Sequence, residues 1–201
     1  MPEKLHPFDQ STYQVRFEWG ADGLVRLAPA DVVVLVDVLG FSASLISTAE
    51  AGRTTEPDAV TAAMTIIEAA ELGEAVVLIG GLRNAAAVAA AVLAEQERRA
   101  ARTSVAVVAA GDGHRFTVED QLGAGAVIAA LADRGIDHSS PEAAAACESF
   151  RGLRRATRHL LTASGSGRAF PGGVDEVHAA AAVDASSAVP VLRDGAVGLG
   201  R

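Results

Sequence analysis

Asp31-Val-Val-Val-Leu-Val-Asp37 is the stretch that says most about the fold. Its five central residues are consecutive aliphatics, and four of them are β-branched. A continuous apolar run of this kind is typical of a strand that is covered on both faces, as in a parallel sheet. Two further apolar runs, Ala75–Ile79 and Val105–Ala110, follow along the chain. We therefore expect three strands of a sheet that is buried on both sides.

Helical patterns separate and follow these three runs. Apolar residues at 45–49 precede Gly52, a residue type that often comes just after a helix end. Between residues 60 and 67, apolar side chains recur at the i, i+3, i+4, i+7 spacing of a helix. Residues 85–99 are rich in alanine, and a fourth pattern begins at Val118. This alternation predicts right-handed parallel crossovers, hence a layered α/β/α domain with a largely parallel or mixed central sheet.

The two ends of the chain are less regular. Apolar and polar residues alternate around a Gly20–Gly23 turn, which predicts two strands within residues 11–30. Val189–Leu192 contains a proline and is predicted to be an edge strand, because proline cannot donate to a ladder. Ser140 is predicted to start a helix, and Gly165-Ser-Gly167 to break the chain.

Composition excludes several classes of protein. A chain of 201 residues can bury a core without disulfides, and Cys147 alone can form none within the chain. A net charge of −8 argues against nucleic acid as a partner. The apolar runs are far shorter than the ~20 residues that span a bilayer, and the N-terminus lacks the apolar region of a signal peptide. We expect a cytoplasmic protein without a membrane partner, and a single domain over residues 1–201.

Carboxylates follow two of the predicted strands. Asp37 ends the first apolar run, and Glu119 and Asp120 begin the helix after the third. Ligands of open α/β sheets bind at the carboxyl edge, where we expect these groups to meet. Together they make a plausible Mg²⁺ site and the candidate catalytic residues. In the alternative interpretation Asp37 only ends a strand, and the two acids only favour the helix dipole.

Four further side chains are candidates for binding an anionic substrate. Ser42 and Ser44 enter the helix after the first strand, where free N–H groups can hold an anion. Arg83 can form paired hydrogen bonds with a phosphate or sulfonate, and Asn84 can cap the next helix or contact the ligand. The alternatives stay open: Ser42 merely caps its helix, and Arg83 lies in solvent.

Three segments in order resemble one family. They are Asp37-Val-Leu-Gly-Phe-Ser42, Val77-Leu-Ile-Gly-Gly-Leu-Arg-Asn-Ala85, and Ala109-Ala-Gly111 continued by Phe116-Thr-Val-Glu-Asp120 and Gly123-Ala-Gly125. They are similar to the 2-phosphosulfolactate phosphatases, the ComB-like family of coenzyme M biosynthesis. The resemblance covers about residues 30–195.

The resemblance implies a Mg²⁺-dependent phosphatase on a ComB-like α/β fold. Its substrate would be a small phosphorylated acid, 2-phosphosulfolactate or a related ester, sulfonated or not. By motif match, Asp37, Asn84, Glu119 and Asp120 inherit the site assignment. Nothing in the resemblance sets the oligomeric state, and a homodimer stays open.

The chain also departs from the family pattern. The family usually has Asp-Val-Leu-Arg, and here the arginine is replaced by Gly40. The family's Gly-Asn-Ser-Pro and Thr-Thr-Asn-Gly-Thr segments are missing between Gly52 and Ala75. Two hypotheses follow. The chain is a phosphatase for a small phosphoester, or it is a catalytically inactive member that binds a small anion or a partner.

Overall fold

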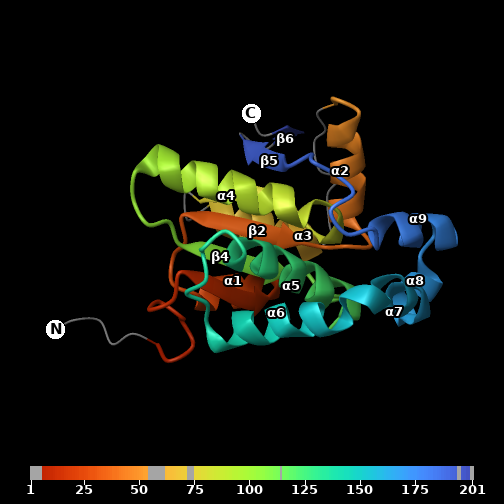
Figure 1. Ribbon diagram of the computed structural model, residues 1–201, viewed down its shortest axis with the longest axis horizontal. Helices are drawn as coiled ribbons and strands as arrows, with labels where there is room; N and C mark the ends of the chain where they lie inside the picture. The colour runs from red at the N-terminus through yellow and green to blue at the C-terminus, as the bar shows by residue number, and fades with distance from the viewer. Residues whose placement is uncertain (1–5, 54–61, 72–74, 114, 194–195, 200–201) are drawn as a thin grey trace.

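A six-stranded mixed sheet is the centre of the part of the chain that the computed structural model describes, which is residues 6–53, 62–71, 75–113, 115–193 and 196–199 (Figure 1). The strand order is β1-β4-β2-β3-β5-β6. The first four are parallel, while β5 is antiparallel to both of its neighbours. The strands are β1 Val15–Trp19, β2 Val32–Val36, β3 Val76–Gly80, β4 Val105–Ala109, β5 Pro190–Arg193 and β6 Ala196–Leu199.

Helices cover both faces of this sheet. Figure 1 shows α4, α5 and α6 running side by side across one face, and α1 and α3 pack on the other. The helices are α1 Gly20–Arg26, α2 Phe41–Glu50, α3 Ala62–Glu71, α4 Ala85–Arg99, α5 Val118–Ala132, α6 Pro141–Leu153, α7 Thr157–Ala163, α8 Gly165–Ala169 and α9 Gly173–Ala180, with 3₁₀ turns at Leu82–Asn84 and Arg154–Ala156. The predicted layered α/β/α class with a mixed sheet is confirmed.

The continuous apolar strands divide their side chains between two cores. In β2, Val32, Val34 and Val36 pack in the core under α4 and α5. Val33 and Leu35 alternate with them and pack in the second core, under α3. Successive side chains of a strand point to opposite faces, so a strand between two helical layers needs apolar residues at every position.

Two glycines let α5 approach its neighbours closely. A Cβ at Gly123 would lie 2.5 Å from Val38 Cγ2, on the side of the sheet. A Cβ at Gly125 would overlap the backbone oxygen of Ala146 in α6. The Gly-Ala-Gly segment therefore seats α5 between the sheet and α6.

Three expectations about local structure were wrong. Residues 20–26 form α1 rather than a second strand, because Ala21, Leu24 and Leu27 share one face and pack in the core with α3. Strand β5 is an inner strand, since β6 pairs with it in a hairpin and takes the edge. Gly165-Ser-Gly167 begins α8, with the Ser164 side chain as its cap.

Other expectations about local structure were confirmed. The Ser140 side chain accepts a hydrogen bond from the Ala143 N–H and starts α6. Gly52 follows the end of α2 with a φ of +66°. Part of the pattern predicted for α3, including Val60, lies outside the described residues. Within the described ranges, every helix is too short or too polar to cross a bilayer.

Candidate active site

A cavity of about 250 Å³ opens beyond the carboxyl ends of β2 and β4. The segment after β2, the loop after β4, the first turn of α5 and the short helix α8 form its walls. It is lined by Asp37, Leu39, Gly111, Asp112, Arg115, Thr117, Glu119, Asp120, Gly165, Ser166 and Ala169. The structure thus brings the three predicted carboxylates together in one cavity at the predicted edge of the sheet. We call it the carboxylate cavity.

Asp37 is held by the turn that leads from β2 into α2. Its backbone N–H donates to Ser42 Oγ at 2.9 Å, and its backbone oxygen accepts from the Ser42 N–H at 2.9 Å. Asp37 Oδ2 accepts from the Phe41 N–H at 3.1 Å. A Cβ at Gly40 would lie 2.7 Å from Asp37 Oδ1 and 2.8 Å from Oδ2. Because Gly40 has no side chain, it leaves room for the carboxylate of Asp37.

Asp120 joins the ends of two strands to α5. Its Oδ1 accepts from the Val38 N–H at 2.7 Å, beyond the end of β2. Its Oδ2 accepts from the Gly111 N–H at 3.0 Å and from Thr117 Oγ1 at 2.8 Å. The residue is only 2% exposed. Both carboxylate oxygens are thus engaged by protein donors, which fixes the geometry of the cavity.

Glu119 differs from its neighbour in having an unused oxygen. It lies in the first turn of α5, lines the carboxylate cavity and is 3% exposed. Its Oε2 is buried and has no hydrogen-bond partner among the described residues. A buried carboxylate oxygen without a donor is costly, so this atom points to a ligand that the protein itself does not supply.

Residues 59–195 match the model of the 2-phosphosulpholactate phosphatase family. This chain belongs to that family. None of the curated proteins matches the chain. The matched residues include Glu119, Asp120 and the loop before them, whereas Asp37 precedes the match. The family name gives hydrolysis of a phosphoric monoester as the kind of activity, and the carboxylate cavity holds the buried acids Glu119 and Asp120 of this phosphatase-family chain.

Sequence reasoning missed two charged residues of this phosphatase-family site, Asp112 and Arg115. Arg115 lines the carboxylate cavity, and its guanidinium donates to Asp112 Oδ2 at 2.8 Å. A Cβ at Gly165 would lie 3.8 Å from Arg115 Nη1, so the guanidinium reaches across to α8. Arg115 could have been predicted as a site residue from its place in the polar loop that follows the third buried strand. The cavity therefore contains a guanidinium although position 40 lacks one.

The electrostatics of the cavity disfavour negative charge. Burial, with a smaller contribution from the charge of Asp37, raises the pKa of Asp120 to about 7, against the lowering effect of the Val38 and Thr117 donors. Burial also raises the pKa of Asp37, with a smaller contribution from the charge of Glu119. The neighbouring carboxylates oppose ionisation of Asp37 and of Asp120, so a cation or a cationic ligand would be stabilised beside them.

The predicted substrate-binding residues lie outside the carboxylate cavity. Ser42 is buried and holds the Asp37 backbone, and Ser44 is exposed on α2. Arg83 donates to Glu50 Oε1 at 2.8 Å and to Ser47 at 3.3 Å. Asn84 is fully buried, and its amide donates to the backbone oxygens of Ile79 and Ala188. Asn84 therefore joins the end of β3 to the segment before β5.

Two of the three predicted carboxylates, rather than all three, suit a metal ion. The described part of the chain contains no group of three His, Cys, Asp or Glu side chains arranged to hold an ion. Both oxygens of Asp120 already accept hydrogen bonds from the protein, so this carboxylate is engaged before any ion binds. Mg²⁺ is commonly held by one or two protein carboxylates together with water and substrate phosphate. Asp37 and Glu119, with its unpartnered oxygen, are the pair whose chemistry fits this ion.

Proposed function

We propose that this chain hydrolyses a small phosphomonoester in the carboxylate cavity, with Mg²⁺ as cofactor. The family name supplies 2-phosphosulfolactate as one candidate substrate within the wider class of small phosphomonoesters. The observation that carries the proposal is the meeting of Asp37, Glu119 and Arg115 in a cavity of about 250 Å³, where Glu119 Oε2 lacks a partner among the described residues. Membership of the phosphatase family supports the reaction type.

The roles follow from the chemistry of each side chain. Asp37 and Glu119 are the residues that would hold Mg²⁺. When bound, the ion neutralises phosphate charge and lowers the pKa of a bound water. Arg115 binds the phosphoryl oxygens, because a guanidinium can form paired hydrogen bonds with them. Asp120 is a positioning residue, since its hydrogen bonds hold the segment after β2 and the loop after β4 around the cavity.

The reaction is hydrolysis of the ester P–O bond. A water oxygen forms a new bond to phosphorus, and the ester oxygen leaves with the bonding electron pair and gains a proton. The products are inorganic phosphate and the alcohol. Positioning the phosphoryl group and stabilising its charge account for most of catalysis in phosphoryl transfer, which is what a guanidinium and two carboxylates with a cation can supply.

One observation favours the second candidate function, an inactive family member that binds a small anion. The arginine of the family's Asp-Val-Leu-Arg segment is Gly40 in this chain. In that case Arg115 would still attract an anion into the carboxylate cavity, but no ester bond would break.

Phosphate release separates the two candidates. We expect the wild type to release phosphate from 2-phosphosulfolactate or another small ester in Mg²⁺ but not in EDTA. Asp37→Asn and Glu119→Gln should each lose at least about 100-fold in kcat/KM. Glu97→Gln is the matched control, because Glu97 is exposed near the far end of α4 and should keep wild-type activity. Binding of inorganic phosphate without any turnover in Mg²⁺ would instead identify an inactive anion-binding protein.

A further inference from the structure

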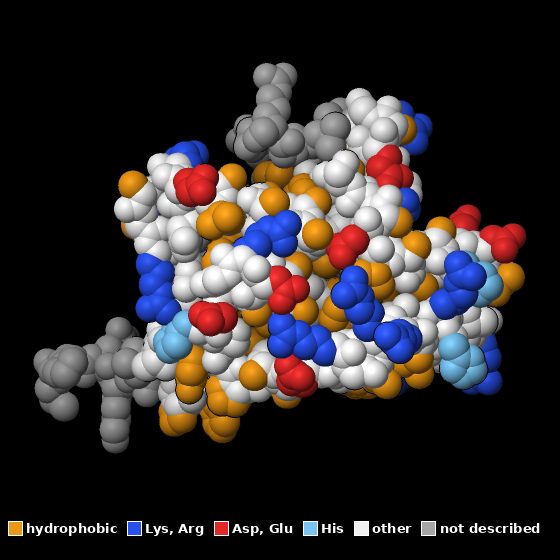
Figure 2. Space-filling view, in the orientation of Figure 1, with side chains coloured by type: hydrophobic (Ala, Val, Ile, Leu, Met, Phe, Trp, Pro, Cys, Tyr) orange, Lys and Arg blue, Asp and Glu red, His pale blue; other side chains and the backbone are white. Residues whose placement is uncertain are grey.

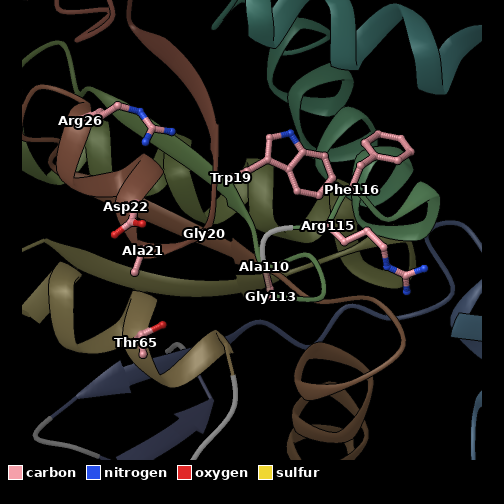
Figure 3. Close-up of a pocket in the computed structure, with 10 residues that line it drawn as sticks. All are labelled: Trp19, Gly20, Ala21, Asp22, Arg26, Thr65, Ala110, Gly113, Arg115 and Phe116. Carbon is pink, nitrogen blue, oxygen red and sulfur yellow. The ribbon is translucent and has the colours of Figure 1, made fainter.

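A second and larger cavity, of about 710 Å³, lies beyond the carboxyl ends of β1 and β4 (Figure 3). It is lined by Trp19, Gly20, Ala21, Asp22, Arg26, Thr65, Ala110, Gly113, Arg115 and Phe116. The reaction proposed above assigns no role to this cavity, whose volume exceeds the needs of a three-carbon acid. We call it the aromatic cavity.

Two aromatic rings form one wall of the aromatic cavity. The centroids of Trp19 and Phe116 are 5.3 Å apart, with the ring planes inclined at 47°. Phe116 is 60% exposed, an unusual degree for a large apolar side chain beside a cavity. Trp19 also makes an edge contact with Phe17 at 5.8 Å, which anchors its ring to the core of the sheet. The wall offers apolar ring surface to a ligand at little ordering cost.

The opposite wall is polar. Figure 3 shows the carboxylate of Asp22 and the side chain of Thr65 across the cavity from the two rings. Arg26, the cation on this side, donates to Glu18 Oε2 at 3.1 Å, whereas Asp22 has no ion-pair partner within the described ranges. A ligand that fits both walls has a flat apolar ring and, at one end, a hydrogen-bond donor or cation for Asp22.

Arg115 connects the two cavities. It lines both of them, and in Figure 3 its side chain extends away from Asp22 and Thr65. Its guanidinium lies near Gly165, which lines the carboxylate cavity. The backbone of Arg115 is fixed to that of Asp112 by two hydrogen bonds, because each N–H donates to the other residue's carbonyl oxygen. A phosphate bound by this guanidinium would thus lie beside the aromatic cavity.

We propose that the aromatic cavity holds the organic group of the substrate, which is a phosphomonoester of an aromatic alcohol that carries a hydrogen-bond donor. This inference rests on the proposed phosphatase function and names its substrate class. The ring packs on Trp19 and Phe116, the donor meets Asp22, and the phosphoryl group enters the carboxylate cavity past Arg115.

Two esters that differ by one ring test the substrate class. O-phosphotyramine has an aromatic ring between its phosphate and its ammonium group, and O-phosphoethanolamine lacks that ring. We expect kcat/KM to be at least about tenfold higher for O-phosphotyramine. Because a phenol is also the better leaving group, the share due to ring burial is the share that is lost on replacing Phe116. Phe116→Ala should remove most of this preference. Phe8→Ala is the matched control, because Phe8 is 63% exposed and lines neither cavity.

Binding can be measured without turnover, because Trp19 is the one tryptophan of the chain. Tyramine, which has no phosphate to release, should change the fluorescence of Trp19 in a saturable titration. Phe116→Ala and Asp22→Asn should each raise the Kd about tenfold, and Phe8→Ala should leave it unchanged.

The outcomes distinguish this inference from the proposed function. Absence of saturable tyramine binding overturns the inference, whether or not small esters are hydrolysed. Equal kcat/KM for the two esters overturns it too, while leaving the phosphatase proposal intact. If no ester is hydrolysed in Mg²⁺, the phosphatase proposal fails and the assignment of a leaving group fails with it, although the titration still reports a ring-binding cavity.

Discussion

The position of the Asp37 carboxylate depends on the lack of a side chain at Gly40. The carboxylate of Asp37 occupies the volume that any side chain at position 40 would need. The same carboxylate is held from behind by the Phe41 N–H. A glycine at position 40 therefore gives the acid a defined position, and Arg115 provides a guanidinium to the cavity from a different segment.

Replacing Gly40 by alanine should impair the site without unfolding the chain. The new Cβ would lie 2.7 and 2.8 Å from the two carboxylate oxygens, so the Asp37 carboxylate must move from its present position. A displacement of about 1 Å can cost on the order of 100-fold in rate. We expect kcat/KM in Mg²⁺ to fall by one to two orders of magnitude, with a Tm close to that of the wild type. Unchanged kcat/KM would show that the position of Asp37 does not matter.

The raised pKa of Asp120 makes stability depend on pH in the metal-free protein. Its pKa is about 7 in the folded state, against 3.8 for an aspartate in the unfolded chain. Between these values the folded state binds more protons, so this group lowers the free energy of unfolding as the pH rises from about 4 to 7. Urea unfolding in EDTA at about pH 5 and about pH 8 should show a larger decrease for the wild type than for Asp120→Asn. Equal decreases would contradict the burial argument.

At the scale of elements, α5 is the helix that connects the site to the core. Its first turn carries Glu119 and Asp120, and almost all of its remaining residues are buried against the sheet, α4 and α6. Small residues allow the short distances between α5 and its neighbours, because a Cβ at Gly123 or Gly125 would overlap them. Any change that moves α5 outward also moves Glu119 away from Asp37.

A matched pair of glycine substitutions tests this close packing. In Gly125→Ala the new methyl group overlaps the Ala146 backbone oxygen, and overpacking of this kind costs about 1–3 kcal/mol. A Cβ at Gly152, in α6, would meet no atom within 4 Å, so Gly152→Ala should stabilise by about 0.4–1 kcal/mol. Chemical denaturation measures both free energies of unfolding. Two variants of equal stability would refute the packing argument.

At the scale of the whole molecule, the strand order places two cavities side by side. Because β4 lies between β1 and β2, the loop after it separates the aromatic cavity from the carboxylate cavity and lines both. On the broad face over α4, α5 and α6, Figure 2 shows acidic and basic side chains interspersed. Unlike that face, the carboxyl edge of the sheet gathers buried acids in one place.

Mg²⁺ should stabilise the whole fold if Asp37 and Glu119 bind it. A ligand that binds only the folded state at about 100 times its Kd adds about 2.7 kcal/mol, and each kcal/mol is worth about 2–4 °C in Tm for a chain of this size. We expect Mg²⁺ to raise the Tm by several degrees over EDTA, and Glu119→Gln to abolish the increase. Glu97→Gln should retain it. An equal Tm for the wild type in Mg²⁺ and EDTA would count against a magnesium site.

Local sequence patterns were enough to predict the three strands β2, β3 and β4 and the edge at which the charged groups meet. The continuous apolar runs at 32–36, 75–79 and 105–110 form strands covered on both faces, and parallel strands bring their carboxyl ends together. The segments that resemble the phosphatase family are each contiguous in the sequence, so the family could also be recognised without the structure. The helix at residues 20–26 could not be predicted in this way, because its apolar face is buried only by packing against α3.

What each polar side chain contacts was settled only by the folded chain. Asp120 accepts a hydrogen bond from the N–H of Val38, 82 positions earlier, and Asn84 donates to Ala188, 104 positions later. Such partners depend on strand order and helix packing, which no local pattern encodes. The same holds for Arg115, whose guanidinium joins the acids only because β4 lies beside β2. The sequence alone determined which chemical groups are available. The strand order and helix packing, which bring distant segments together, determined which of these groups share a cavity.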